Sequence, residues 1–117
     1  MSGLKPIVWL GDSLVRLRVA SADIRSDAGY QLDLVQRGEP PTDFKPMPDV
    51  GSGVMEIRVR GETEFRVFYV ARFNEAVYVL HSFAKKTRAT RKADIELGRQ
   101  RYASMLDLRR STREVKK

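Results

Sequence analysis

The sequence predicts an α+β fold in which helices pack against a small mixed or antiparallel sheet. The first observation is a pair of runs rich in Val, Phe and Tyr that flank a short Asn74-Glu75 connection, as in a β-hairpin. The second is the strict alternation of apolar and polar residues over 54–60. The third is the helical spacing of apolar residues both before and after these strands. Together they predict the order β-αα-βββ-α.

The N-terminal part of the chain predicts one strand and two helices. The apolar run of residues 6–10 ends at Gly11-Asp12 and has the length of a buried strand. Asp12 or Ser13 can cap a helix that ends at about Ala20. A second helix begins at Ser21 or Asp23 and ends before Gly38. Its apolar face is regularly spaced and comprises Ile24, Ala28, Leu32 and Val35.

The middle of the chain predicts a loop followed by three strands. Residues 38–53 contain four prolines and three glycines, a composition typical of a loop. Strands over 54–60, over 65–73 and from about Ala76 to Lys85 are joined by short turns, which favours an antiparallel meander. If alternation holds, His81 shares a face with Val77, Val79 and Phe83.

The last predicted element is a helix that Thr90 caps and that ends at about Leu108. Its apolar side comprises Ile95, Gly98, Tyr102, Met105 and Leu106. Residues 111–117 are basic and lack periodicity, so they are expected to be a frayed tail. We therefore predict a single domain over residues 1–110 and a basic tail over residues 111–117.

Composition restricts the possible functions. The 117-residue chain has no cysteine, which excludes disulfides and thiolate chemistry. The first residues contain too short an apolar run for a signal peptide or a membrane span, so a cytoplasmic protein is expected. Residues 1–84 carry 10 Lys/Arg against 11 Asp/Glu, whereas residues 85–117 carry 12 against 4. This one-sided charge favours a surface that binds a polyanion such as nucleic acid.

Cations on neighbouring strands are the candidate catalytic residues. The single histidine excludes a two-histidine ribonuclease arrangement, and the sequence has neither metal-ligand spacing nor a phosphate-binding glycine loop. We expect neither a metal nor a cofactor. In a meander, Arg58, Arg66, Lys85 and Lys86 can converge, bind RNA phosphates and stabilise a phosphorane-like transition state. Arg58 and Arg66 can equally pair with surface glutamates (Glu56, Glu62 or Glu64).

Five further residues are candidate RNA contacts. Three of them, Arg88, Arg91 and Lys92, continue the charge that begins at the end of the last strand. The loop residue Lys45 can reach a ligand, although an isolated loop lysine is usually only solvated. His81 is the fifth, although a core histidine is the more common outcome for such a position.

Several sequence blocks resemble the RelE/HigB-type toxins of bacterial type II toxin–antitoxin systems, in the branch of phage-derived toxin-like proteins. The resemblance runs from about Asp12 to Arg101, and its most specific block is residues 77–87. The remaining blocks are Gly29-Tyr30-Gln31-Leu32, Gln36-Arg37-Gly38, Val54-Met55-Glu56-Ile57-Arg58, residues 65–70 and Asp94-Ile95-Glu96. The chain departs from the family pattern at Arg91, where proline is common, and at Gly98, where alanine is usual.

The resemblance implies the same fold and a metal-independent endoribonuclease that cuts translated mRNA on the ribosome. It implies an antitoxin partner with a helix-turn-helix DNA-binding domain, in a toxin–antitoxin hetero-oligomer. It points to Arg58, Arg66, Lys85 and Lys86 around the scissile phosphate. Two alternatives remain open: a module that binds RNA or the ribosome and blocks translation without cutting, and a degenerate member that only binds its antitoxin or DNA.

Overall fold

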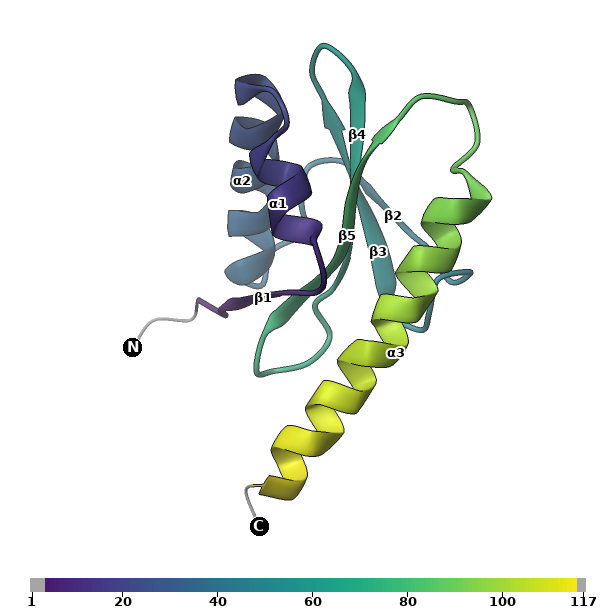
Figure 1. The fold of residues 1–117 in the computed structure, drawn as a ribbon. Helices are drawn as coiled ribbons and strands as arrows, with labels where there is room; N and C mark the ends of the chain where they lie inside the picture. Colours follow the sequence, from purple (N-terminus) through teal and green to yellow (C-terminus); the bar gives the residue numbers. More distant parts are fainter. Residues whose placement is uncertain (1–3, 116–117) are drawn as a thin grey trace.

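The computed structural model describes the backbone of residues 4–115 and the side chains of residues 4–112. Its elements follow the predicted order, with one additional short strand (Figure 1). They are β1 (Ile7–Trp9), α1 (Ser13–Arg18), α2 (Ala22–Gln36), β2 (Phe44–Pro46), β3 (Val54–Arg60), β4 (Glu64–Val70), β5 (Val77–Lys85) and α3 (Lys92–Val115). The predicted α+β class is therefore confirmed.

The five strands form one mixed sheet in the order β1-β5-β4-β3-β2. The segment from β2 to β5 is an antiparallel meander, whereas β1 lies parallel to β5 at one edge. The strand β2 lies inside the predicted loop, which is therefore only partly irregular. It pairs with β3 over three residues at the other edge of the sheet, where the missing N–H of Pro46 can be tolerated.

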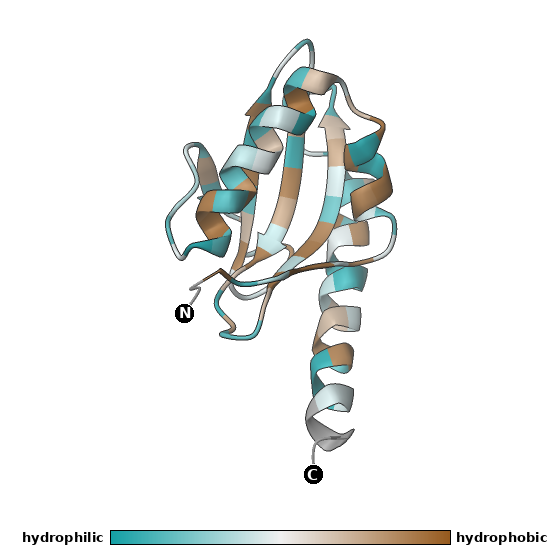
Figure 2. Ribbon diagram, turned by 90° about the vertical axis from the view of Figure 1, so that its left-hand side faces the viewer, coloured by the Kyte–Doolittle hydropathy of each residue, from teal (hydrophilic) through white to brown (hydrophobic). Residues whose placement is uncertain are grey.

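Helices cover the two faces of the sheet unequally (Figures 1 and 2). On one face, α1 and α2 pack on a core that includes Ile57, Val59, Val67 and Val79. On the other, α3 packs on a second core that includes Phe68. Figure 1 shows α3 crossing this face obliquely and then running past the sheet. The helix therefore does not cover the start of β4 and the end of β5, which lie near its own first residues.

A β-bulge in β5 changes which side chains face α3. Phe68 pairs with His81 and Tyr69 pairs with Val79, so Leu80 is the extra residue. Val77 and Val79, which precede the bulge, pack on the α1–α2 side. From Leu80 onwards the alternation of side chains between the two faces is shifted by one residue. The predicted shared face of His81 with Val77 and Val79 is wrong for this reason.

The last helix is longer than predicted and closely packed near its start. It continues past Leu108 through Val115, so residues 111–115 are helical, while residues 116–117 lie outside the described part of the chain. The division at residue 110 into a domain and a tail stays a prediction. A Cβ at Gly98 would lie 2.9 Å from Val50 Cγ1 and 3.0 Å from Phe68 Cδ2. The glycine therefore lets α3 approach the sheet. Within the described residues, no helix is long and apolar enough to cross a membrane.

Candidate functional site

Strand register brings four of the predicted cations onto one face of the sheet, on the side of α3. Lys45 pairs with Glu56, Arg58 pairs with Arg66, and Glu64 pairs with Lys85. Directly paired residues project from the same face of a sheet. Lys45, Arg58, Arg66 and Lys85, which come from four consecutive strands of the meander, therefore form a cation cluster.

A buried carboxylate lies at the centre of the cation cluster. Glu56 is only 1% exposed. Its Oε1 lies 3.6 Å from Arg66 Nε and 3.9 Å from Arg58 Nε, and its Oε2 has no hydrogen-bond partner among the described residues. Sequence reasoning treated Glu56 only as a possible surface partner of the arginines. Alternation along β3 placed it on the face of Arg58, but alternation does not reveal burial.

Burial and the surrounding cations act on Glu56 in opposite directions. Burial raises the pKa of the Glu56 carboxyl, because removal from water disfavours the charged form. The positive charges of Arg66, Lys45, Arg58 and Lys85 lower this pKa, but they do not overcome the effect of burial. The carboxylate is therefore held at an energetic cost in the middle of its counterions.

Exposed carboxylates hold the outer parts of both arginines. Arg66 Nη2 donates to Glu64 Oε1 at 2.6 Å, and Arg58 Nη1 lies 3.5 Å from Asp43 Oδ1. The predicted pairing with a surface glutamate is confirmed for Glu64 with Arg66. Glu56 pairs with both arginines but is buried, and Glu62 makes no ion pair among the described residues. Glu64 is 60% exposed at its side chain, whereas the Arg66 side chain is only 7% exposed, so a phosphate would have to displace Glu64 to reach Arg66.

The two adjacent lysines at the end of β5 differ in their surroundings. Lys85 belongs to the cation cluster, and its Nζ donates to the Arg88 carbonyl at 2.6 Å. Lys86 lies just past the end of β5, is exposed, and makes no hydrogen bond or ion pair within the described part of the chain. The structure therefore brings Lys85, but not Lys86, into the cation cluster, and the catalytic role of both stays a prediction.

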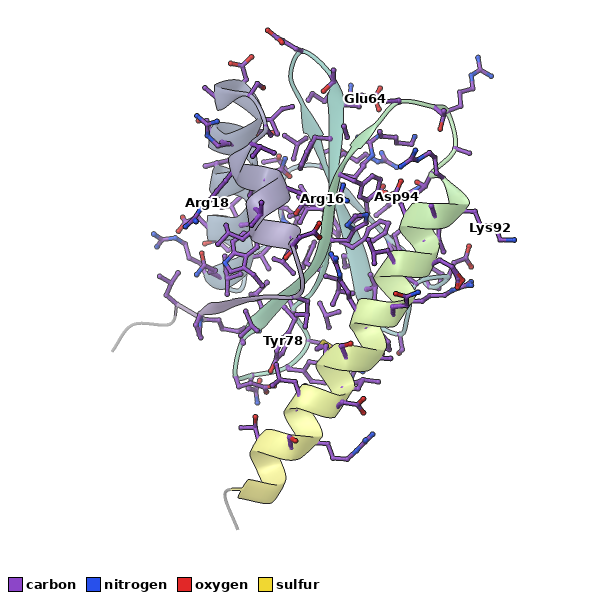
Figure 3. All side chains as sticks on the ribbon, in the orientation of Figure 1. Arg16, Arg18, Glu64, Tyr78, Lys92 and Asp94 are labelled. Carbon is purple, nitrogen blue, oxygen red and sulfur yellow. The ribbon has the colours of Figure 1, made fainter. Side chains whose placement is uncertain are left out.

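The remaining predicted cations lie between β5 and the start of α3. Arg88 and Lys92 have exposed side chains, and Figure 3 shows Lys92 pointing away from the sheet at the first turn of α3. Arg91 is also exposed, but its Nε donates to Asp94 Oδ2 at 3.2 Å. These residues border the cation cluster without being part of it.

His81 is a buried structural residue and does not offer a surface to RNA. Its side chain is 1% exposed, stacks on Phe83 at 4.7 Å between ring centroids, and shares a 2.8 Å hydrogen bond with Asp94 Oδ1. Burial lowers the pKa of His81, although Asp94 opposes this change. The imidazole is therefore neutral at pH 7 and donates from Nε2. The ring is buried in this conformation, so the RNA contact of His81 stays a prediction that the burial does not favour.

This arrangement can bind and polarise an anion. Two guanidinium groups and two ammonium groups surround a surface at the open end of the sheet, and guanidinium groups bind phosphate oxygens in pairs. Among the described residues, no group of three or more His, Asp or Glu side chains is placed to hold a metal ion. The chemistry that the four cations themselves supply is electrostatic.

Comparison with protein families agrees with this architecture. Residues 16–103 match the family model described as phage derived protein Gp49-like (DUF891). The chain belongs to this Gp49-like family. The family is associated with RelE-like toxins, and membership points to a toxin-like protein in a toxin–antitoxin context. No curated protein matches the chain. The matched range includes the whole cation cluster and Glu56.

Proposed function

We propose that this Gp49-like protein is the toxin of a type II toxin–antitoxin pair and cleaves translated mRNA on the ribosome. The observation that carries the proposal is the cation cluster around Glu56 on the open end of the sheet. Family membership adds the toxin-like context. The proposed partners are a helix-turn-helix antitoxin, the ribosome and mRNA, and the proposed site of action is the cytoplasm.

In the proposed reaction, the substrate supplies its own nucleophile. The 2′-hydroxyl oxygen attacks the adjacent phosphorus, the bond from phosphorus to the 5′-oxygen breaks, and the products are a 2′,3′-cyclic phosphate and a 5′-hydroxyl. Arg58 and Arg66 stabilise the additional negative charge on the phosphorane oxygens. The 2′-hydroxyl proton leaves to a base at the rim of the cluster, and a proton reaches the departing 5′-oxygen. Lys45 and Lys85 are the accessible side chains for these transfers.

Glu56 acts in this proposal as a positioning residue. Its carboxylate has almost no exposed surface, so the 2′-hydroxyl does not reach it in this conformation. It instead holds two like-charged guanidinium groups on neighbouring strands in place before RNA arrives. A preorganised group of donors stabilises developing charge without reorganising during the reaction.

The adjacent lysines of the β5 end provide a matched test. Lys85→Ala and Lys86→Ala remove the same charge from consecutive positions, but only Lys85 belongs to the cation cluster. Each variant would be induced alone in cells, with growth and new mRNA 5′ ends recorded together. We expect Lys85→Ala to reduce cutting by about 10²-fold or more, as for loss of a group that transfers a proton, and Lys86→Ala to cut like the parent. Equal behaviour of the two variants would contradict the site assignment.

The parent chain in the same experiment separates the alternative functions. Growth arrest with new 5′ ends inside translated frames supports the ribonuclease. Arrest without new ends would instead support a non-catalytic translation inhibitor that uses the same cations to bind RNA or the ribosome. Normal growth would support a degenerate member that binds only its antitoxin.

A further inference from the structure

A cavity lies on the face of the sheet opposite the cation cluster. It has a volume of about 380 Å³ and opens between the segment that joins α1 to α2 and the adjoining ends of β4 and β5. Its apolar walls include Val19, Ala20, Phe65 and Ala84, and Arg16 lies at its border. Neither the cation cluster nor the proposed cleavage chemistry uses this cavity.

Two buried hydroxyl groups in the cavity wall have no hydrogen-bond partner within the described residues. They are Ser21 Oγ and Ser82 Oγ. Ser82 is 0% exposed, and it pairs with Val67 of the core beneath α1 and α2. Its side chain therefore projects from the cavity face. Buried polar groups are almost always hydrogen-bonded to protein or to ordered water, so a ligand group or a water molecule in the cavity would satisfy these two hydroxyls.

The edge of β5 adds main-chain groups to the same cavity. The strand β1 pairs only with Val77, Tyr78 and Val79. Within the described chain, residues 82–84 thus have no strand neighbour on that edge, and all three line the cavity. Hydroxyls and strand-edge amides provide both donors and acceptors, and the Phe65 ring provides an apolar wall. This combination fits a flat ring with a polar edge, as a nucleobase presents.

Positive charge lies beside the cavity on α1. Arg16 borders it and pairs with Asp12 at 2.8 Å. Arg18 is exposed, and no hydrogen bond or ion pair is formed by its side chain in the described part of the chain. Figure 3 shows Arg18 on the side of α1 and α2, far from Lys92, whereas Arg16 lies towards the middle of the view. A nucleotide whose base enters the cavity would direct its phosphate towards this side.

Alternate residues at the start of β4 connect the cavity to the cation cluster. Thr63 and Phe65 line the cavity, whereas Glu64 and Arg66 belong to the opposite face. An RNA strand that bends over the turn between β3 and β4 can contact both sites. We propose that the cavity holds one unpaired base of the RNA substrate, at a nucleotide flanking the cleavage position. The assignment rests on the RNA-cleaving function proposed above.

Binding of single nucleotides to the full-length protein tests the cavity directly. The four nucleoside 5′-monophosphates AMP, GMP, CMP and UMP would be titrated into isotope-labelled protein while backbone amide NMR signals are followed. We expect one or two of them to shift the signals of Ala20, Ser82 and Ala84. Loss of one hydrogen bond in Ser82→Ala should weaken this binding by up to about tenfold. Ser104→Ala, which removes an exposed hydroxyl on α3, is the matched control.

Two outcomes would overturn the base site. One is nucleotide binding that shifts only signals of the cation cluster, or that Ser82→Ala leaves unchanged. The other is a cavity that responds to N-acetyltyrosine amide and to none of the nucleotides. That result would assign it to an aromatic side chain of a protein partner, for which the exposed Val19 would form part of the rim.

A cleavage readout separates failure of the base site from failure of the proposed function. In cells, Ser82→Ala should lose part of the sequence preference at one position near the cut, whatever its effect on the total number of cuts. Unchanged preference with normal cutting would reject the base site alone. If the parent chain makes no cuts, the ribonuclease function is rejected, and the nucleotide titration still decides whether the cavity binds a base.

Discussion

The two faces of the sheet have different compositions although they share the same strands. The face beneath α1 and α2 has an apolar core and buries the neutral polar residues Gln31 and Ser82. The face beneath α3 combines an apolar core with the buried charged or polar residues Glu56, Arg66, His81 and Asp94. The first face therefore stabilises the fold, while the second also positions charge. The variants below test this division, from the largest expected effect to the smallest.

Ile57→Ala should have the largest effect on stability. Ile57 is 0% exposed in the core beneath α1 and α2, and truncation of such a side chain costs about 2–5 kcal/mol. Urea unfolding followed by circular dichroism would measure the change. At a temperature where the variant stays folded, its RNA cutting should match the parent. Selective loss of cutting would mean that this face also contributes to the site.

Glu56→Gln should reduce activity without reducing stability. Because burial raises the pKa of Glu56, its ionised form is costly in the folded protein, and a neutral amide of similar shape avoids that cost. We expect the melting temperature to stay the same or rise, while cutting falls by about tenfold or more as Arg58 and Arg66 lose their shared counterion. A lower melting temperature together with normal cutting would make Glu56 purely structural.

His81 should make the protein less stable in mild acid. Its pKa is lowered in the folded state, so the unfolded chain binds more protons as pH falls below the ordinary histidine value of about 6.5. Stability from the neutral imidazole is complete above that pH and is lost as pH falls towards the lowered pKa. Unfolding measured at pH 7.5 and pH 5.5 should show this loss, and His81→Asn should make the dependence shallower.

Two helical glycines should respond in opposite ways to alanine. A Cβ at Gly29 meets no atom within 4 Å, so Gly29→Ala should stabilise α2 by about 0.5–1 kcal/mol. At Gly98, the added Cβ would press on Val50 and Phe68, so Gly98→Ala should give no gain or a loss. Paired thermal melts compare the two variants. A similar gain at both positions would mean that α3 moves away from the sheet at little cost.

Much of the fold was predictable because local patterns and tertiary packing agree. The alternation over residues 54–60 corresponds to β3 with the same bounds, and the spacing of Ile24, Ala28, Leu32 and Val35 gives the buried face of α2. The strand β2 was missed because a three-residue edge strand among prolines has no periodicity of its own. The face of His81 was mispredicted because a single bulge residue reverses alternation without a sequence signal.

The cations of the site were predictable from the sequence, but the buried carboxylate at its centre was not. Arg58, Arg66 and Lys85 follow from strand order and alternation, and Lys45 joins them only because β2 exists. The role of Glu56 depends on how deeply the folded chain buries it, which is a property of tertiary structure. The difference between Lys85 and Lys86 likewise depends on the residue at which β5 ends.

The parallel pairing of β1 with β5 has a consequence for the order of folding. Ile7 pairs with Val77, whereas the contacts within the β2–β5 meander join residues that are much closer along the chain. Closing the longer loop costs more chain entropy, and such non-local contacts slow folding. The meander should therefore form first, with β1 and α1 docking onto it afterwards. Residues 82–84 of β5, which β1 does not reach, keep an unpaired edge throughout this sequence of events.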